Sequence, residues 1–291
     1  MKKIIIILSL LLIISCTTNN QDSNINWRTG TEGLTMNFAQ NSPPVEVLSN
    51  QDVSVIVEYS NKGASDISDL KFYLSGYDSS ILNFAQKGDS SLPLQGKDQY
   101  NPSGGQADIV KWTASVNSPS DVDSFEQEIT LTACYRYKTI ANPQICIDPK
   151  KYDYTSSSTC SFDIKNLGSS QGGPIAVTSI KQKSTTDKVL LEIYIENKGG
   201  GVPFTTSIDN CHTSLDLRDV NTINVGAVTL SGTQMFSCEP PNPVRLDNGK
   251  GYIVCRTGIS GSSYYVSPLT ITLDYGYRQS ISKTITVVNV G

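Results

Sequence analysis

The stretch ITLTACYR, residues 129–136, recurs 142 positions later as ITLDYGYR, residues 271–278. Both copies alternate apolar and polar side chains, which is the pattern of a β-strand with one buried face. The apolar sides consist of Ile129, Leu131, Ala133, Tyr135 and Tyr137 in the first copy and of Ile271, Leu273, Tyr275 and Tyr277 in the second. Because a slip of one residue would turn these side chains to water, we expect both copies to keep the same face inward.

A second echo shows that the repeat extends beyond one motif. VSVIVEYSNKG, residues 53–63, returns as VLLEIYIENKG, residues 189–199, at an offset of 136. Both segments alternate with period two, and both end at Asn-Lys-Gly, where glycine suits a tight turn. The predicted inward sets are Val53, Val55, Val57 and Tyr59, and Val189, Leu191, Ile193 and Ile195. Two echoes at nearly one offset indicate a duplicated β-unit.

The fold class follows from these strands and from a composition rich in β-forming residues. We expect further strands at residues 70–74, 109–116, 175–180, 252–255 and 281–290, with Trp112 in the core, a hairpin turn at Asn248-Gly249 and another turn soon after Arg278. The prediction is an all-β protein with two tandem immunoglobulin-like antiparallel β-sandwich domains. They would span residues 30–166 and 172–291, joined by a linker at 167–171.

The N-terminus reads as a lipoprotein signal. Lys2 and Lys3 precede an apolar run over residues 4–14, which is too short for a bilayer span of about 20 residues, and Ser15-Cys16 follows. The run IISC is similar to a lipobox, so we predict a signal peptide at residues 1–15 and acylation of Cys16. The alternatives are an ordinary cleaved signal or an uncleaved anchor. Residues 16–29 are expected to be a lipidated tether, which places the protein on the extracytoplasmic face of the cell membrane.

Net charge and cysteine content indicate which partners and which bonds the protein is expected to have. Loss of Lys2 and Lys3 takes the net charge from −4 to about −6, and no basic patch is visible, so nucleic acid is not an expected partner. Six cysteines remain after Cys16, which outside the cytoplasm indicates disulfides: Cys134, Cys146, Cys160, Cys211, Cys238 and Cys255. A zinc site is the alternative, but no C-x-x-C is present and only one histidine is. We expect no metal and no cofactor.

The disulfide pairing is only partly predictable. A bond between Cys134 and Cys146 would close a short loop, leaving one cysteine unpaired in each half; these two could join the halves, as in Cys160–Cys211, or stay free. Because the Asn248-Gly249 turn sets Cys255 opposite Asn242, a Cys238–Cys255 bond requires the first strand to bulge or bend at EPPNP, residues 239–243.

Residues 138–158 lengthen the last connection of the first copy and form the first candidate for a contact surface. The candidate binding residues are Lys150, Lys151, Tyr152 and Tyr154. The alternative is a solvated loop without a ligand, since tyrosines and charges also occupy idle loops.

Catalytic patterns are weak throughout the chain. A Ser-His-Asp triad would need His212, which lies in NCHTS, and no G-x-S-x-G motif accompanies it. The carboxylates Asp121, Asp123, Glu126 and Glu128 could serve a glycosidase or hold calcium, but they also suit the exposed start of a strand. We predict no catalytic residue and therefore no enzyme.

The run TGTEGLTMNFAQNSPP, residues 29–44, together with NKG, ACYRY, CIDP and LDYGYR, resembles a surface lipoprotein family of small-genome archaea. The resemblance covers nearly all of the mature chain and implies tandem immunoglobulin-like domains behind a signal peptide, but it brings no activity. The leading hypothesis is a structural or adhesive module at the cell surface that binds a protein or glycan. The alternatives are an accessory subunit of a membrane or envelope complex and an extracytoplasmic hydrolase.

Overall fold

The computed structural model describes residues 26–290 except 92, 118–121, 150–163, 186, 214, 260 and 262. The predicted signal peptide and Cys16 lie outside this part. The described chain is all-β, as predicted, with one short 3₁₀ helix, η2. Among these residues, none builds a helix with the length and apolarity that a bilayer crossing demands.

The described residues of the first half of the chain form ten strands. They are β1 (Leu34–Phe38), β2 (Glu46–Leu48), β3 (Asp52–Asn61), β4 (Leu70–Ser75), β5 (Leu82–Phe84), β6 (Gly88–Ser91), β7 (Ala107–Val116), β8 (Ser124–Ala141), β9 (Gln144–Ile147) and β10 (Ile164–Asn166).

The described residues of the second half form nine strands and η2. They are β11 (Ile175–Ser184), β12 (Lys188–Asn197), β13 (Val202–Phe204), η2 (Ile208–Asn210), β14 (Thr222–Leu230), β15 (Gln234–Met235), β16 (Ser237–Glu239), β17 (Val244–Arg245), β18 (Lys250–Gly258) and β19 (Tyr265–Val288).

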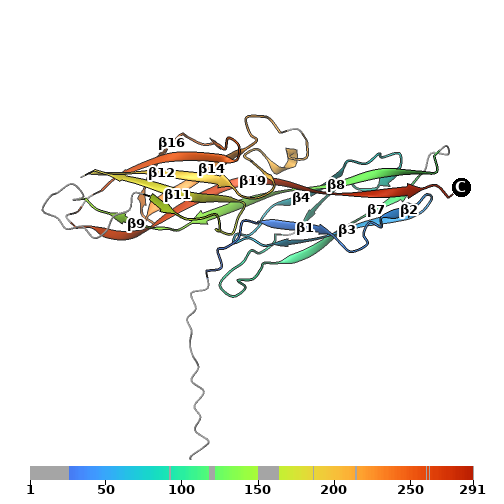
Figure 1. The fold of residues 1–291 in the computed structure, drawn as a ribbon, viewed down its shortest axis with the longest axis horizontal. Helices are drawn as coiled ribbons and strands as arrows, with labels where there is room; N and C mark the ends of the chain where they lie inside the picture. Colours follow the sequence, from blue (N-terminus) through green and yellow to red (C-terminus); the bar gives the residue numbers. More distant parts are fainter. Residues whose placement is uncertain are drawn as a thin grey trace, which may run out of the picture.

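The molecule is elongated, with two lobes placed end to end (Figure 1). One sheet of each lobe lies within a single half of the chain or nearly so, in the orders β1-β3-β7-β5 and β10-β11-β12-β18-β16. The third sheet is common to both lobes and runs β15-β14-β19-β8-β4-β6. Its centre is the antiparallel pair of β8 and β19, the two longest strands, which extend through both lobes.

Because β8 pairs with β19, the C-terminal end of each copy lies in the lobe that contains most of the other copy. Residues 271–288 pair with residues 141–124, and the last three residues of β19 also pair with β2 in the first lobe. The expected turn after Arg278 is therefore wrong, and residues 281–288 continue β19 instead of forming a separate strand. The lobes thus differ from the residue ranges 30–166 and 172–291, because the end of each copy packs in the lobe of the other.

The topology supports the duplication inferred from the two echoes. In each half, the strand that ends at Asn-Lys-Gly, β3 or β12, lies between two partners in the same way: β1-β3-β7-β5 corresponds to β11-β12-β18-β16. In the common sheet, β6-β4-β8 corresponds to β15-β14-β19. The two copies therefore meet through β8 and β19 in an antiparallel arrangement, as two subunits of a two-fold dimer would.

Burial confirms the predicted faces. All nine inward residues of the two ITL motifs are at most 3% exposed, and the eight inward residues of β3 and β12 are at most 4% exposed. Trp112 lies in the core at 4% exposure. Buried apolar residues of both lobes belong to one contiguous cluster, because the β8–β19 pair carries apolar side chains from one lobe into the next.

We predict that the end of β19 stabilises the first lobe although it belongs to the second copy. Ile285 is fully buried, so Ile285→Ala should lower the free energy of unfolding by about 2–5 kcal/mol through lost burial and a cavity. The exposed neighbour Thr284 provides the control, and Thr284→Ala should change stability by about 0.5 kcal/mol or less. Chemical denaturation measures both. Equal stability of the two variants would contradict the placement of this segment.

Candidate functional site

Four tyrosines form the centre of the molecule on the inner face of the β8–β19 pair. Tyr135 lies opposite Tyr277, and Tyr137 lies opposite Tyr275, on either side of the Arg136–Gly276 pair. Their neighbouring rings are 5.8–6.1 Å apart between centroids, in tilted or edge-on arrangements that suit aromatic packing.

Each of the four tyrosine hydroxyls forms a hydrogen bond between the β8–β19 pair and the backbone of another segment of the chain. Tyr137 donates to Gly172 O (2.9 Å) and accepts from Ser65 N (3.1 Å). Tyr277 accepts from Gly201 N (2.9 Å). Ser65 and Gly201 each lie four residues after the asparagine of an Asn-Lys-Gly turn, so these two tyrosines have equivalent roles.

The other two tyrosines are equivalent in the same way. Tyr135 accepts from Leu34 N (3.3 Å) at the start of β1, and Tyr275 accepts from Ile175 N (3.4 Å) at the start of β11. Residues with equivalent structural roles at the junction are therefore 140 positions apart, whereas the sequences ITLTACYR and ITLDYGYR align at an offset of 142. The inward face is unaffected, because the two alignments differ by an even number of residues.

Burial raises the pKa of all four phenols. The pKa of Tyr277 rises to about 12, mainly through desolvation, and the pKa values of Tyr135 and Tyr275 rise well above the ordinary value for the same reason. Desolvation also raises the pKa of Tyr137. The hydroxyls therefore stay protonated at physiological pH and serve as structural hydrogen-bonding groups.

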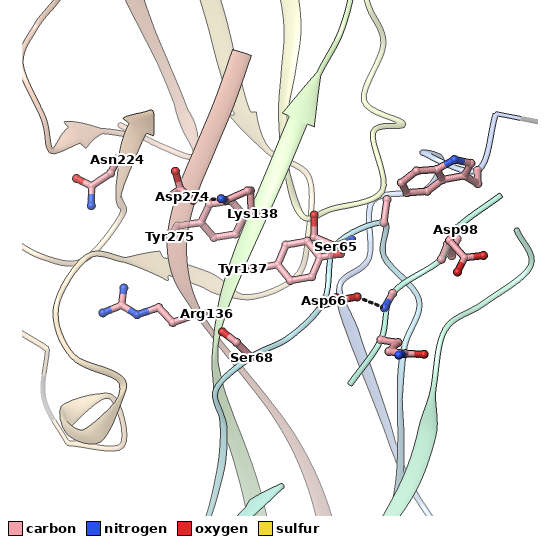
Figure 2. Close-up of a pocket in the computed structure, with 15 residues that line it drawn as sticks. Ser65, Asp66, Ser68, Asp98, Arg136, Tyr137, Lys138, Asn224, Asp274 and Tyr275 are labelled. Carbon is pink, nitrogen blue, oxygen red and sulfur yellow. Dashed lines mark hydrogen bonds and ion pairs between the residues drawn. The ribbon is translucent and has the colours of Figure 1, made fainter. Parts of the chain in front are cut away.

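A cleft of about 760 Å³ opens beside this tyrosine cluster, at the junction of the lobes. Its walls come from the loops at residues 64–68 and 95–98, from β8 at residues 136–138, from Asn224 of β14 and from Asp274 and Tyr275 of β19; Trp27 also lines it (Figure 2). The volume falls in the range of ligand sites. We call this the junction cleft.

The junction cleft exists because the two copies differ at one strand. By the Asn-Lys-Gly alignment, Ile67 corresponds to Pro203, which lies in β13 and pairs with Tyr277 of β19. Ile67 instead forms a bridge with Leu94, with backbone bonds of 2.9 and 3.0 Å. The chain thus turns away from β8 at the place where the second copy covers β19, and the edge of β8 stays open.

The charges around the junction cleft balance. Three cations, Lys97, Arg136 and Lys138, face three anions, Asp66, Asp98 and Asp274. Lys138 Nζ lies 3.4 Å from Asp274 Oδ1.

Several of these groups are held by the backbone. Lys97 Nζ donates to Thr29 O (2.9 Å), and Arg136 Nη2 donates to Thr206 O (2.6 Å). Asp66 Oδ1 accepts from Gly96 N (2.8 Å). The cleft is polar and has no excess of either charge, which favours a neutral ligand surface.

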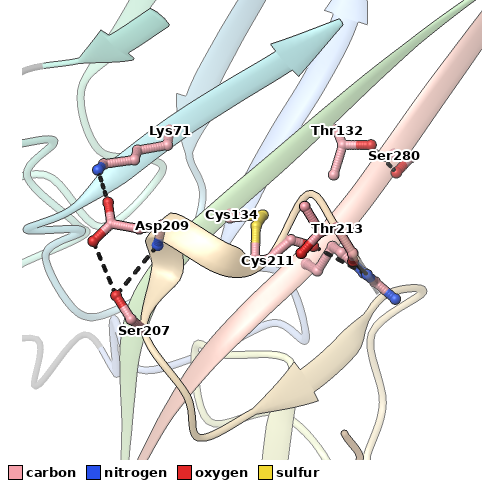
Figure 3. Close-up of a disulfide and its surroundings, with 9 residues drawn as sticks. Lys71, Thr132, Cys134, Ser207, Asp209, Cys211, Thr213 and Ser280 are labelled. Carbon is pink, nitrogen blue, oxygen red and sulfur yellow. Dashed lines mark hydrogen bonds and ion pairs between the residues drawn. A yellow bond between two sulfur atoms is a disulfide. The ribbon is translucent and has the colours of Figure 1, made fainter. Parts of the chain in front are cut away.

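The disulfide between Cys134 and Cys211 corrects the predicted Cys134–Cys146 bond (Figure 3). Cys134 points to the outer face of β8, where a segment of the second copy after β13 covers it. This segment fits because Gly276 has no side chain, and an added Cβ there would collide with the Phe204 ring. The sequence suggested that one bond could join the halves, but through Cys160–Cys211, not through Cys134.

The segment after β13, residues 205–213, also contacts both long strands and β4 through side chains. Asp209 of η2 forms an ion pair with Lys71 of β4. Arg278 Nη1 donates to Cys211 O (3.0 Å). His212 stacks on Tyr73, with ring centroids 4.1 Å apart. The exposed His212 therefore has a packing role, and none of these contacts places a serine and a carboxylate on it as a triad requires.

Cys238 and Cys255 form a second disulfide between directly paired residues of β16 and β18. The sequence predicted that this bond requires a bend at EPPNP, residues 239–243. The structure has such a departure, because the chain leaves this sheet at residues 240–243 and β17 pairs with β14 instead. Asn248 and Gly249 both have positive φ, as a type I′ turn requires. Cys146 is also disulfide-bonded.

The remaining predicted site residues do not come together in the described structure. Lys150, Lys151, Tyr152, Tyr154, Cys160 and Asp121 lie outside it. Asp123, Glu126 and Glu128 are exposed at the start of β8. No group of potential metal ligands occurs among the described residues. The loop expected at 138–158 begins as strand, because β8 continues to Ala141 and β9 follows.

No sequence pattern predicted the junction cleft or its residues Asp66, Lys97, Arg136 and Lys138. The one available signal was the second tyrosine of YRYK, residues 135–138, which matches YGYR, residues 275–278, at the offset of 140. That alignment sets Arg136 against Gly276 and identifies the central position at which the copies differ.

Comparisons with known proteins identify no family. No family model matches the chain, and no curated protein matches it. Among solved structures, a match is the native conformation of Escherichia coli alpha-2-macroglobulin, at 10% identity and a TM-score of 0.16. The alignment covers 88% of this chain and 17% of that chain. A TM-score this low supports no inference about function.

We predict that the Tyr137 hydroxyl stabilises the junction. Tyr137→Phe removes one donor and leaves Ser65 N without its acceptor, so the free energy of unfolding should fall by about 1–3 kcal/mol. Tyr252, at 57% exposure, is the matched control, and Tyr252→Phe should have almost no effect. Thermal or chemical denaturation decides the matter; similar losses in the two variants would refute a structural role of the hydroxyl.

We also predict a hierarchy of the two disulfides. On the loop-entropy model, the Cys134–Cys211 bond has a sequence separation of 77 and destabilises the unfolded chain by about 4.5 kcal/mol. The Cys238–Cys255 bond has a separation of 17 and contributes about 3 kcal/mol. Paired Cys→Ala variants compared by denaturation should show the larger loss for the first. Mass mapping of the unreduced protein should yield a linked Cys134–Cys211 peptide, and a Cys134–Cys146 peptide would contradict the structure.

Proposed function

We propose that the protein is a non-enzymatic, lipid-anchored module of the cell surface that presents the junction cleft to a partner. The observation that carries this proposal is the position of the N-terminal segment. Residues 27–30 lie at the junction and not at either tip of the molecule, because Gly30 N donates to Ser170 Oγ (2.7 Å) and Gly30 O accepts from Gly172 N (2.9 Å).

This attachment changes the expected geometry at the membrane. Two stacked domains on a tether would present one distal tip. A tether that enters at the junction leaves both lobes pointing sideways and keeps the junction cleft near the lipid. Trp27 lines the cleft and follows Cys16 by eleven residues, which span at most about 40 Å when fully extended.

The short distance between the junction cleft and the lipid favours a second candidate function, that of an accessory subunit of a membrane or envelope complex. A cleft within about 40 Å of the membrane suits a partner in the same envelope better than a surface on another cell. Three features support a binding role without catalysis: the tyrosines stay protonated, the charges of the cleft are balanced, and His212 is occupied in packing. The hydrolase alternative has no arrangement of described residues in its favour.

We predict that Cys16→Ser abolishes incorporation of labelled palmitate and releases the protein from the membrane fraction, since no other acylated position is expected. The variant should retain the Cys134–Cys211 bond, which controls for folding. Labelling that persists in Cys16→Ser would reject the lipid anchor.

The partner itself is tested by crosslinking mass spectrometry on intact membranes. We expect crosslinks from Lys97 and Lys138, at the cleft, to another envelope protein. Lys188 is an exposed lysine of β12 and provides the comparison. Crosslinks to a partner from Lys188 alone would move the binding surface away from the cleft.

A further inference from the structure

We propose that the junction cleft binds an extended segment of a partner protein, which pairs as an additional strand with the exposed edge of β8 at residues 136–138. This inference rests on the proposed function and specifies the class of partner for the same cleft. An added strand gains affinity from main-chain hydrogen bonds along an open sheet edge.

The second copy shows what fits such an edge. There, β13 lies along β19, with Val202 opposite Arg278 and Phe204 opposite Gly276. At the structural offset of 140, the equivalent positions of β8 are Lys138 and Arg136. The protein therefore already fills one of its two equivalent edges with an extended segment of its own chain, and the junction cleft marks the other edge.

The departure of residues 64–68 toward Leu94 leaves room beside β8 at the place where β13 lies beside β19 in the second copy. The junction cleft, which these residues line together with residues 136–138 of β8, measures about 760 Å³.

The backbone of β8 offers hydrogen-bonding groups to the junction cleft. Arg136 N donates to Asp69 O (3.2 Å), which is the last bond between this edge and the chain that leads into β4. Because backbone groups of a strand alternate between its two sides, Lys138 N and O lie on the same side as Arg136 N and away from β19. In the part of the chain that the structure describes, no strand pairs with Lys138 on that side.

The side chains around the edge indicate the character of the segment. The three cations and three anions of the cleft balance, so the segment should carry little net charge. Trp27 provides an aromatic surface beside the edge, and Arg28 lies over its ring at 4.5 Å. We therefore expect a mainly uncharged segment rich in β-forming residues.

A pair of variants at one position separates backbone from side-chain binding. Lys138→Pro removes the N–H that faces the cleft and leaves the bonds to β19 in place, which is the setting in which strands tolerate proline. Lys138→Ala removes the same side chain and its ion pair with Asp274 but keeps the N–H. The probes are heptapeptides selected from a random phage-displayed library against the full mature chain, with cellohexaose and chitohexaose as glycan probes.

We expect selected peptides to bind Lys138→Pro about tenfold more weakly than wild type, through loss of a main-chain bond and obstruction of the edge, and Lys138→Ala within about threefold. In wild type, peptide binding should slow hydrogen exchange of the Lys138 amide at least about tenfold, as measured by NMR. This second readout decides the matter if the proline variant does not fold.

Equal binding of the peptides to both variants, or unchanged exchange at Lys138, would overturn the strand-pairing proposal. Binding of a hexasaccharide without selection of any peptide would also overturn it and would assign the cleft to glycans. Neither result touches the proposed surface role, which depends on the Cys16 anchor and on the membrane crosslinks. Failure of the two proposals is therefore distinguishable.

Discussion

The antiparallel pairing of β8 with β19 is the constraint on which the rest of the structure depends. It joins the two copies through 18 consecutive residue pairs and carries the apolar core from one lobe into the other. Four buried tyrosines at its centre each hold a backbone group of another segment, so the junction loops and the starts of β1 and β11 are fixed by the same cluster. Two sandwiches on a flexible linker would lack this coupling.

The two copies are equivalent in topology but differ at the centre, and this difference creates the candidate site. Gly276 leaves space for Phe204, and the segment after β13 is then bonded to the first copy through Cys134–Cys211. Arg136 occupies the equivalent position of β8, where residues 64–68 turn away to Leu94. One edge of the junction is therefore covered by the chain and the other is open. The junction cleft therefore lies at the one of these two equivalent places that the chain leaves uncovered.

The same junction also receives the N-terminal segment, which relates the architecture to the membrane. A lipid anchor eleven residues before Trp27 would hold the cleft close to the bilayer, with a lobe on either side. A partner of the same envelope could then meet the open edge of β8 without crossing a large distance. Rigidity of the β8–β19 ribbon would preserve the shape of that edge, since both long strands are hydrogen-bonded in the two lobes.

The sequence alone determined the local features: the all-β class, the inward faces of both repeats, the burial of Trp112 and the Asn248-Gly249 turn. Each of these features depends on the alternation of apolar and polar residues, or on turn-forming residues, within a short stretch of sequence. The tertiary structure alone decided that β19 runs on past Arg278, that Cys134 bonds to Cys211 and that Ile67 pairs with Leu94. An extended strand has the same local pattern whichever lobe it enters, so only packing between distant segments can select its partner.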